Sequence, residues 1–290
     1  MTASPRVRLI DDPRRDPMAE TVEGWLAGLG GPSVLRVPGR DRRRARGFAT
    51  LLHGNEPSGV RALHAWLRSR AVPGVDLVCF VGAVAAALAP PRFAHRLLPG
   101  RSDLNRCFRP PFDGPNGEIA GEALRLLREA GCDALVDLHN NTGHNPPYGV
   151  ATAVDAARLQ LTALFGERLI VSDLRLGTLT EATSEDFPSL TVECGRAGDP
   201  AADRVAREGL ERYAALDEIE TRRLPALPIA ILGEAVRVCA RSDVSRDWFV
   251  LRDGLLATRR AAIPIMMTVD AAVARSDCLF YLVLPRKERV

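Results

Sequence analysis

Lysine is almost absent from this chain of 290 residues, since Lys287 is the one lysine among 39 lysine and arginine residues. The 36 acidic residues nearly balance the arginines, and the formal net charge is +3. A chain so close to neutrality lacks the strong positive field that binds polyanions. The basic run RDRRRAR at 40–46 also lacks the interleaved aromatic side chains that stack on nucleic-acid bases. We therefore expect a solvated turn between two strands at 40–46, and no nucleic-acid partner.

Long apolar segments and paired cysteines are missing as well. The longest stretch of low charge, at 77–91, contains glycine, ends in two prolines and is too short to span a bilayer. Residues 1–17 hold only Leu9 and Ile10 as an apolar run, so we expect no signal peptide. The six cysteines form no CxxC pair, which is typical of reduced thiols in a cytosolic protein. We expect a cytoplasmic protein with no membrane partner.

Short apolar runs alternate with segments of helical periodicity, the pattern of an α/β domain whose strands are buried on both faces. The pattern predicts strands at 33–37, 48–52, 76–82, 134–138, 169–172 and 190–192, and helices at 59–70, 117–130 and 200–216. Beyond residue 217 only short strands are expected, at 235–239, 248–251, 263–269 and 278–284. We predict a large α/β domain at 1–217 and a small β-rich C-terminal domain at 218–290.

Three side chains capable of acid–base or metal chemistry follow predicted strands. His53 follows FATLL, His139 follows ALVDL, and Glu193 follows SLTV. In open α/β sheets, ligands bind outside the carboxyl ends of the strands. We therefore expect these three side chains to face one cavity.

The stretch HGNE at 53–56 adds a carboxylate to this group. His53, Glu56 and His139 would supply two imidazoles and a carboxylate, leaving a fourth position of a catalytic zinc ion open for water. Glu193 is then the spare carboxylate that can take a proton from the water and return it to a leaving nitrogen. Asp137 shares a strand face with His139 and either orients that ligand or caps the end of the sheet.

The segment GRSDLNRCF at 100–108 carries groups suited to binding a substrate. Asn105 and Arg106 place an amide beside a planar guanidinium, which can hold a carboxylate in a bidentate way. Arg96 and Arg101 lie upstream, and either can polarise a carbonyl oxygen. Because arginine is common throughout this chain, this segment taken alone is not evidence of a function.

Four motifs in order, HGNE (53–56), DLNR (103–106), DLHN (137–140) and VECG (192–195), resemble the succinylglutamate desuccinylase/aspartoacylase family of the zinc carboxypeptidase clan. The resemblance covers roughly residues 45–215. It implies a three-layer α/β/α catalytic domain around a mixed, largely parallel sheet, with one zinc ion per chain. It further implies hydrolysis of the amide bond of a small N-acyl amino acid, and a β-rich C-terminal domain that narrows the approach to the site.

The resemblance also implies roles for single residues. The zinc ligands correspond to His53, Glu56 and His139, and the general base to Glu193. The residues expected to bind a carboxylate-bearing substrate are Asn105, Arg106 and Asn140. The carbonyl-polarising arginine corresponds to Arg96 if two residues are inserted before DLNR, and Arg101 is its rival.

The chain departs from the family pattern at the second substrate anchor. Thr183 stands where members specific for acetylaspartate carry an arginine, and RAGD replaces the Pro-Gln pair that follows the base motif. Tyr281 is the candidate for a C-terminal tyrosine that reaches the substrate. We therefore expect intact catalytic machinery with a different substrate preference.

The other histidines and Cys194 have simpler interpretations. His64 is expected to pack or to face solvent, and His95 and His144 to lie in loops. Cys194 alternates to the strand face opposite Glu193 and is expected to be packed.

The predicted function is that of a zinc-dependent deacylase acting on linear amides. One alternative is a metallocarboxypeptidase acting on short peptides, and another, from a different class, is a non-catalytic protein that binds carboxylates. The expected partner is a small carboxylate-bearing substrate, and assembly into a homo-oligomer remains open.

Overall fold

The computed structural model describes residues 7–141, 146–172 and 174–219, together with strands at 230–238, 249–252, 255–258, 263–265 and 280–284. The strands in the first three ranges are β1 (Arg8–Asp11), β2 (Ser33–Val37), β3 (Asp41–Thr50), β4 (Val75–Val81), β5 (Cys132–Asn141), β6 (Tyr148–Ala151), β7 (Arg168–Val171) and β8 (Ser189–Arg196). The helices are α1 (Val22–Leu29), α2 (Ser58–Arg68), α3 (Val84–Leu88), α4 (Gly114–Glu129), α5 (Ala156–Phe165), α6 (Leu179–Thr183), α7 (Pro200–Ala215) and the short 3₁₀ helix η1 (Leu104–Arg106).

These strands form one mixed sheet in the order β1-β2-β4-β3-β5-β8-β6-β7. At its centre, β3 pairs in parallel with β4 and β5, and β5 pairs in parallel with β8. β2 and β6 run antiparallel to their neighbours β4 and β8. The carboxyl ends of β3, β5 and β8 therefore lie at one edge of the sheet, where ligands bind in open α/β folds.

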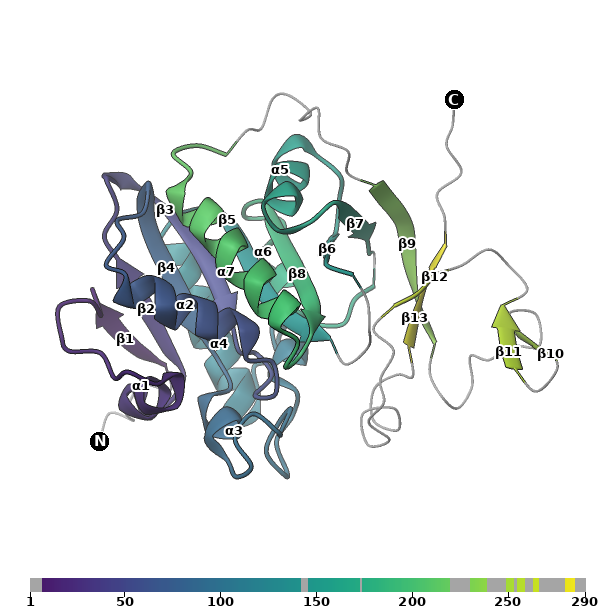
Figure 1. The fold of residues 1–290 in the computed structure, drawn as a ribbon, viewed down its shortest axis with the longest axis horizontal. Helices are drawn as coiled ribbons and strands as arrows, with labels where there is room; N and C mark the ends of the chain where they lie inside the picture. Colours follow the sequence, from purple (N-terminus) through teal and green to yellow (C-terminus); the bar gives the residue numbers. More distant parts are fainter. Residues whose placement is uncertain are drawn as a thin grey trace.

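Helices cover both faces of the sheet. One hydrophobic cluster joins the sheet to α1, α2, α5 and α7, and a second joins it to α4 and α6. Figure 1 shows α2 and α7 side by side on the face turned toward the viewer. The arrangement is the three-layer α/β/α architecture, which confirms the predicted fold class.

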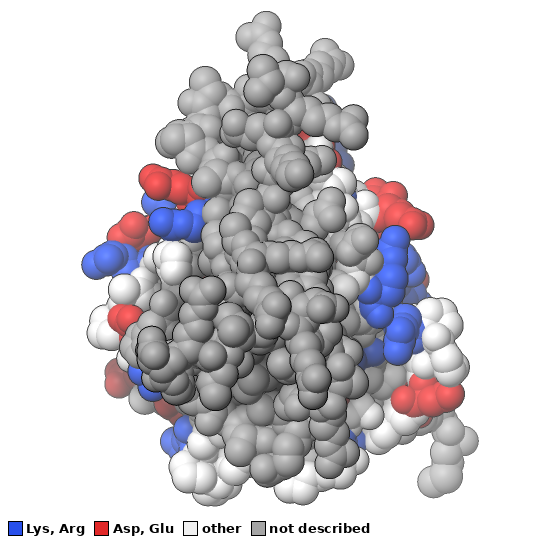
Figure 2. Space-filling view, turned by 90° about the vertical axis from the view of Figure 1, so that its right-hand side faces the viewer, with Lys and Arg blue, Asp and Glu red and all other residues white. Residues whose placement is uncertain are grey.

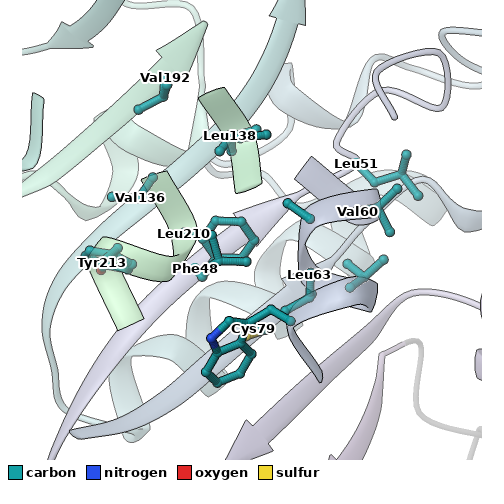
Figure 3. Packing of buried hydrophobic residues seen from close by; sticks show 14 of the residues in the cluster. Phe48, Leu51, Val60, Leu63, Cys79, Val136, Leu138, Val192, Leu210 and Tyr213 are labelled. Carbon is teal, nitrogen blue, oxygen red and sulfur yellow. The ribbon is translucent and has the colours of Figure 1, made fainter. Parts of the chain in front are cut away.

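The core beneath α2 and α7 holds the central strands in place. Phe48 of β3, Leu63 of α2 and Leu210 of α7 have no exposed surface, and all belong to one cluster. Figure 3 shows these side chains gathered between the two helices and the sheet. Complete burial of such a side chain stabilises the fold by about 1.5–3 kcal/mol. The strand ends that bear the site residues are thus packed against a fully buried core.

The prediction of a solvated turn at 40–46 is wrong, because residues 41–46 form the first part of β3, which ends at Thr50. Arg46 is 1% exposed, and its guanidinium donates to Asp133 Oδ1 at 3.1 Å and to the carbonyl of Leu216 at 2.9 Å. The arginines at 42–44 each form an ion pair with an aspartate. Successive side chains of a strand point to opposite faces, so neighbouring arginines are kept apart and each can meet a different aspartate. A basic run therefore does not require a turn.

Other element boundaries differ from the predictions by a few residues. β5 continues through Asn141 and β8 through Arg196, so His139 and Glu193 lie within the last part of each strand rather than after it. Gly131 follows α4 with φ +62°, the left-handed conformation in which a glycine commonly ends a helix.

Beyond residue 219 the described elements are the strands β9 (Ala230–Val238), β10 (Phe249–Arg252), β11 (Leu255–Thr258), β12 (Ile263–Ile265) and β13 (Phe280–Leu284). β9 pairs in parallel with β7. β13 pairs antiparallel with β9, and β12 pairs antiparallel with β13. β10 and β11 form a separate antiparallel pair. The strand-rich character predicted for this region is confirmed for these elements, while a domain boundary at 217–218 stays a prediction.

No helix within the described ranges combines the length and the apolar character that crossing a membrane requires. Figure 2 shows acidic and basic side chains interspersed on both flanks of the face that it presents.

Candidate metal centre and active site

His53, Glu56 and His139 come together at the edge formed by the ends of β3 and β5. One ligand atom from each lies within 4.8 Å of the others. All three side chains are buried, with 4%, 6% and 3% of their surface exposed. The structure thus brings the three predicted ligands together, and their binding of a metal ion stays a prediction.

The orientation of the two imidazoles decides what the cluster can hold. His53 Nδ1 lies 2.8 Å from Glu56 Oε1, and His139 Nδ1 lies 2.7 Å from Glu56 Oε2. The two opposite ring nitrogens face carboxylates as well, with His53 Nε2 3.0 Å from Asp103 Oδ1 and His139 Nε2 2.9 Å from Asp137 Oδ2.

A neutral imidazole has one N–H, which leaves its second nitrogen as an acceptor. If each Nε2–H donates to its aspartate, both Nδ1 lone pairs point at a carboxylate that can only accept. Such a group of acceptors is stable only around positive charge, from two protons or from one cation. Two imidazole nitrogens and a carboxylate oxygen are ligands that Zn²⁺ prefers. The residues therefore fit a divalent metal ion.

Asp103 contacts the cluster although the sequence did not single it out within the DLNR motif. Its Oδ1 faces His53 and also accepts from the backbone N–H of Asn105 at 2.8 Å. Asp137 contacts His139 in the same manner, which supports the first of its two interpretations, that it orients this ligand. Carboxylates in these positions fix the tautomer of metal-binding histidines.

The charges of the cluster shift the pKa values of its members in opposite directions. Burial opposes ionisation of Glu56, but the two adjacent imidazoles outweigh it and hold its pKa below the ordinary range. Burial likewise disfavours charged His139, but Asp137 and Glu56 outweigh it and raise the pKa of the imidazole well above its usual value. Both pKa shifts show that the cluster favours an ionised Glu56 with positive charge beside it.

Glu193 lies on β8 opposite His139 of β5 in the strand register. It is 3% exposed, and its Oε2 atom has no hydrogen-bond partner among the described residues. Burial, reinforced by the negative charge of Glu56, raises its pKa to about 8. An unsatisfied buried carboxylate oxygen beside a metal-ligand cluster is suited to accepting a proton from a substrate or a water molecule.

The backbone around HGNE brings His53 and Glu56 to the edge of the sheet. Leu51, just after β3, has φ +57°, a left-handed conformation that costs a residue with a side chain about 1–3 kcal/mol. Gly54 packs so closely on α3 that a methyl group there would lie 2.6 Å from the backbone nitrogen of Ala87. The backbone N–H of Gly54 donates to the carbonyl of Arg96 at 2.9 Å. The turn at 53–56 is thus fixed by its packing on α3 and by its hydrogen bond to the carbonyl of Arg96.

Asn140 joins the end of β5 to the start of α2. Its Oδ1 accepts from the backbone N–H of Ser58 at 3.0 Å, and its Nδ2 contacts Ser58 Oγ at 2.9 Å and the carbonyl of Gly195 at 3.1 Å. Its backbone N–H also reaches Glu56 Oε2 at 3.3 Å. These contacts give Asn140 a positioning function, and its predicted contact with a substrate stays a prediction.

Of the two candidate arginines, Arg96 is the one that reaches the cluster. Its guanidinium donates to Asp103 Oδ2 at 2.8 Å and to Glu56 Oε1 at 3.4 Å. Arg101 is exposed. The geometry therefore favours Arg96 for interaction with a substrate carbonyl.

Asn105 and Arg106 lie on η1 next to the cluster. Asn105 is 5% exposed, its Oδ1 accepts from the backbone N–H of Leu179 at 3.0 Å, and its Nδ2 is 3.4 Å from His139 Nε2. Arg106 donates to the carbonyl of Asn105 at 2.8 Å. The structure brings both residues to the site, and their binding of a carboxylate stays a prediction.

Cys194 is packed as predicted, and of the two interpretations of His64 the structure supports packing. Cys194 is 1% exposed, its thiol donates to the carbonyl of His139 at 2.9 Å, and burial raises its pKa well above the usual value. His64 lies 2.9 Å from the carbonyl of Ala19. His95 contacts the carbonyl of Pro90, while His144 lies outside the described residues.

Thr183, at the position of the acetylaspartate-specific arginine, is fully buried. Its hydroxyl donates to the carbonyl of Leu179 at 2.9 Å and lies 2.8 Å from Ser189 Oγ. It therefore offers no group to a substrate. The side chain of Tyr281, on β13, lies outside the part of the chain that the structure describes.

The family model of the succinylglutamate desuccinylase/aspartoacylase catalytic domain matches residues 51–218, which include the whole of the cluster and the substrate-binding candidates. The chain belongs to this family. It is accordingly a hydrolase of the desuccinylase/aspartoacylase type, and the resemblance predicted from the four motifs is confirmed. A comparison with curated proteins returned no match.

Several solved structures share the fold. The succinylglutamate desuccinylase from Chromobacterium violaceum is 16% identical, with 89% of each chain covered and a TM-score of 0.63. The enzyme of the same name from Vibrio parahaemolyticus is 17% identical, with 88% of this chain and 86% of that chain covered and a TM-score of 0.61. The ectoine utilization protein EutE (DoeB) from Ruegeria pomeroyi is 18% identical, with 89% of this chain and 77% of that chain covered and a TM-score of 0.53.

Proposed function

We propose that this protein is a zinc-dependent amidohydrolase that cleaves the linear amide bond of a small N-acyl amino acid. The observation that carries the proposal is the group of two imidazole Nδ1 atoms and one carboxylate that face a common point. Oε2 of Glu193, which has no hydrogen-bond partner among the described residues, supports a hydrolytic rather than a purely structural metal site beside it. A protein that only bound carboxylates would not need either feature.

His53, Glu56 and His139 would hold the ion, which when bound polarises the amide carbonyl and makes a water molecule more acidic. Glu193 accepts a proton from the attacking water and gives it to the nitrogen of the leaving amine. The oxygen of water becomes bonded to the acyl carbon as the carbon–nitrogen bond breaks, and a carboxylate and an amine are released. Arg96 donates to the carbonyl oxygen as negative charge develops there.

The metal content of the protein tests this proposal most directly. Freshly purified protein should contain close to one zinc ion per chain by elemental analysis, and His53→Ala or His139→Ala should remove it. Asp103→Asn keeps all three ligands and should weaken zinc affinity about 10–100-fold, since the ligand loses the carboxylate that orients it. Wild-type protein that neither contains nor binds zinc would refute the mechanism.

Arg106 is proposed to bind the carboxylate of the amino-acid half of the substrate. Loss of one partner of a desolvated charge pair costs about 2–5 kcal/mol, so Arg106→Ala should lower kcat/KM strongly. Arg106→Lys should recover only part of it, since an ammonium group cannot form the bidentate pair. Equal rates of wild-type hydrolysis of N-acyl amino acids and their amides would remove Arg106 from this role.

The buried hydroxyl of Thr183 supports a second proposal, that N-acetylaspartate is a weak substrate. A screen of N-acyl amino acids and short peptides tests it against the alternatives. Preferred turnover of N-acetylaspartate would contradict the proposal, and preferred release of C-terminal residues from peptides would identify a metallocarboxypeptidase instead.

A further inference from the structure

A cavity of about 160 Å³ lies beyond the ends of β3 and β4, beside the metal-ligand cluster. In Figure 1 this region is at the lower end of the molecule, around α3. The cavity is lined largely by apolar residues, namely Leu52, Val84, Leu97, Leu98, Leu104 and Ile119. The mechanism described above uses none of these side chains.

The cavity and the active site share a wall. Leu52 directly precedes the ligand His53, and Leu104 stands between Asp103 and Asn105 in η1. Arg96 also lines the cavity, and its guanidinium contacts Glu56 and Asp103. A group attached to a carbonyl carbon beside Arg96 would therefore be next to this apolar space.

We infer that the cavity receives the acyl chain of the substrate and that this chain is apolar and about four to six carbons long. The inference rests on the proposed function, in which Asn105 and Arg106 bind the amino-acid half and Arg96 meets the carbonyl. The acyl half then extends past Arg96 into the cavity. At about 30 Å³ for a group of the size of water, the cavity has room for about five such groups.

The charged and polar groups of the cavity do not call for a charged acyl chain. Arg101 lines the cavity but is exposed, and an ion pair with an exposed arginine contributes little to binding. Asn116 donates its side-chain N–H to the carbonyl of Ser102 at 2.6 Å. Arg96, the other cationic group of the lining, already pairs with Glu56 and Asp103. A carboxylate placed among the leucines would therefore lose its hydration without a free cationic partner.

The test measures kcat/KM of the full, zinc-loaded chain for one amino acid carrying acetyl, butanoyl, hexanoyl or dodecanoyl groups. Burial of each methylene should raise kcat/KM about fourfold, so that values rise from acetyl to hexanoyl and fall at dodecanoyl. Butanoyl and succinyl derivatives have the same number of carbons, and the butanoyl derivative should be the better substrate. Hexanoate should also inhibit at lower concentration than acetate, which reports on the cavity without turnover.

Ile119 on α4 offers a way to change the cavity at some distance from the catalytic groups. Ile119→Phe should fill it and lower the ratio of hexanoyl to acetyl hydrolysis, and Ile119→Ala should shift the optimum to longer chains. Ile10→Phe is the matched control, since Ile10 is a half-buried isoleucine on β1 that does not line the cavity. The control should keep the wild-type ratio, and should Ile119→Phe fail to fold, Ile119→Ala and the inhibition series carry the test.

The outcomes separate this inference from the proposed function. If no N-acyl amino acid of any length is hydrolysed, the proposed function fails and the acyl cavity with it. If the acetyl derivative is hydrolysed as well as the longer ones, or if succinyl exceeds butanoyl, only the inference about an apolar acyl chain is overturned. An unchanged chain-length preference in both Ile119 variants would overturn it too.

Discussion

Glu193 has a buried carboxylate oxygen, Oε2, without a hydrogen-bond partner in the described structure. Glu193→Gln removes the base but leaves the three ligands untouched. Zinc content should therefore persist while kcat falls about 10²–10⁴-fold, the usual contribution of general acid–base catalysis. Elemental analysis and steady-state kinetics of the same preparation check both halves. A variant with zinc and nearly wild-type turnover would exclude Glu193 as the base.

The same residue predicts how the stability of the metal-free protein depends on pH. The pKa of Glu193 is raised from 4.5 to about 8, so across this range the folded state keeps a proton that the unfolded chain releases. Linkage then requires stability to fall as pH rises through this range. Glu193→Gln has no such proton, and its Tm relative to wild type should increase from pH 5 to pH 8. Thermal melts of chelator-treated protein measure this difference, and a constant difference would contradict the raised pKa.

At the scale of secondary-structure elements, the active site depends on how the end of β5 meets the start of α2. Asn140→Ala leaves the backbone N–H of Ser58 without its partner, which should lower the free energy of unfolding by about 1–3 kcal/mol. Asn141→Ala is the matched control, since the amide of Asn141 is equally buried but has no hydrogen-bond partner among the described residues. Denaturant unfolding compares the two.

The result for Asn140 also decides between its two roles. If Asn140→Ala keeps wild-type stability and only raises KM, the residue binds substrate and does not position α2. If stability and zinc affinity fall together, the positioning function is correct. Ser58 Oγ also lies 2.6 Å from Asp203 Oδ1, which links the same helix start to α7. The loss of stability in Asn140→Ala should therefore exceed that of a surface substitution.

On the scale of the whole molecule, Arg46 joins parts of the chain that are far apart in sequence. Its guanidinium binds Asp133 on β5 and the carbonyls of Tyr213 and Leu216 around the end of α7. Removal of one partner of a fully buried ion pair costs about 3–5 kcal/mol, and the cost here is smaller because the side chain of Asp133 is 24% exposed and also pairs with Arg44. Arg46→Met should therefore lower the Tm by several degrees, whereas Arg43→Met, at a side chain that is 89% exposed, should not. Equal melting temperatures for both variants would show that the contacts of Arg46 do not stabilise the fold.

Much of the catalytic group could be predicted because short motifs at strand ends report directly on the edge of a parallel sheet. His53, His139 and Glu193 each stand at or near the end of an apolar run, and parallel pairing brings such ends together. The contribution of Asp103 could not be predicted in this way. Its partner His53 lies fifty residues away, and only the course of the chain through η1 brings the two together.

The sequence by itself determined the α/β class, the order of the motifs and the candidate metal ligands, because periodicity and residue chemistry are local properties. The tertiary structure decided which nitrogen of each histidine faces Glu56, that Arg96 rather than Arg101 reaches the cluster, and that Asn140 holds the start of α2. It also decided that the basic run at 40–46 is a strand. Each of these depends on contacts between residues distant in sequence, and a linear pattern does not specify the partners that a charge or an amide will meet.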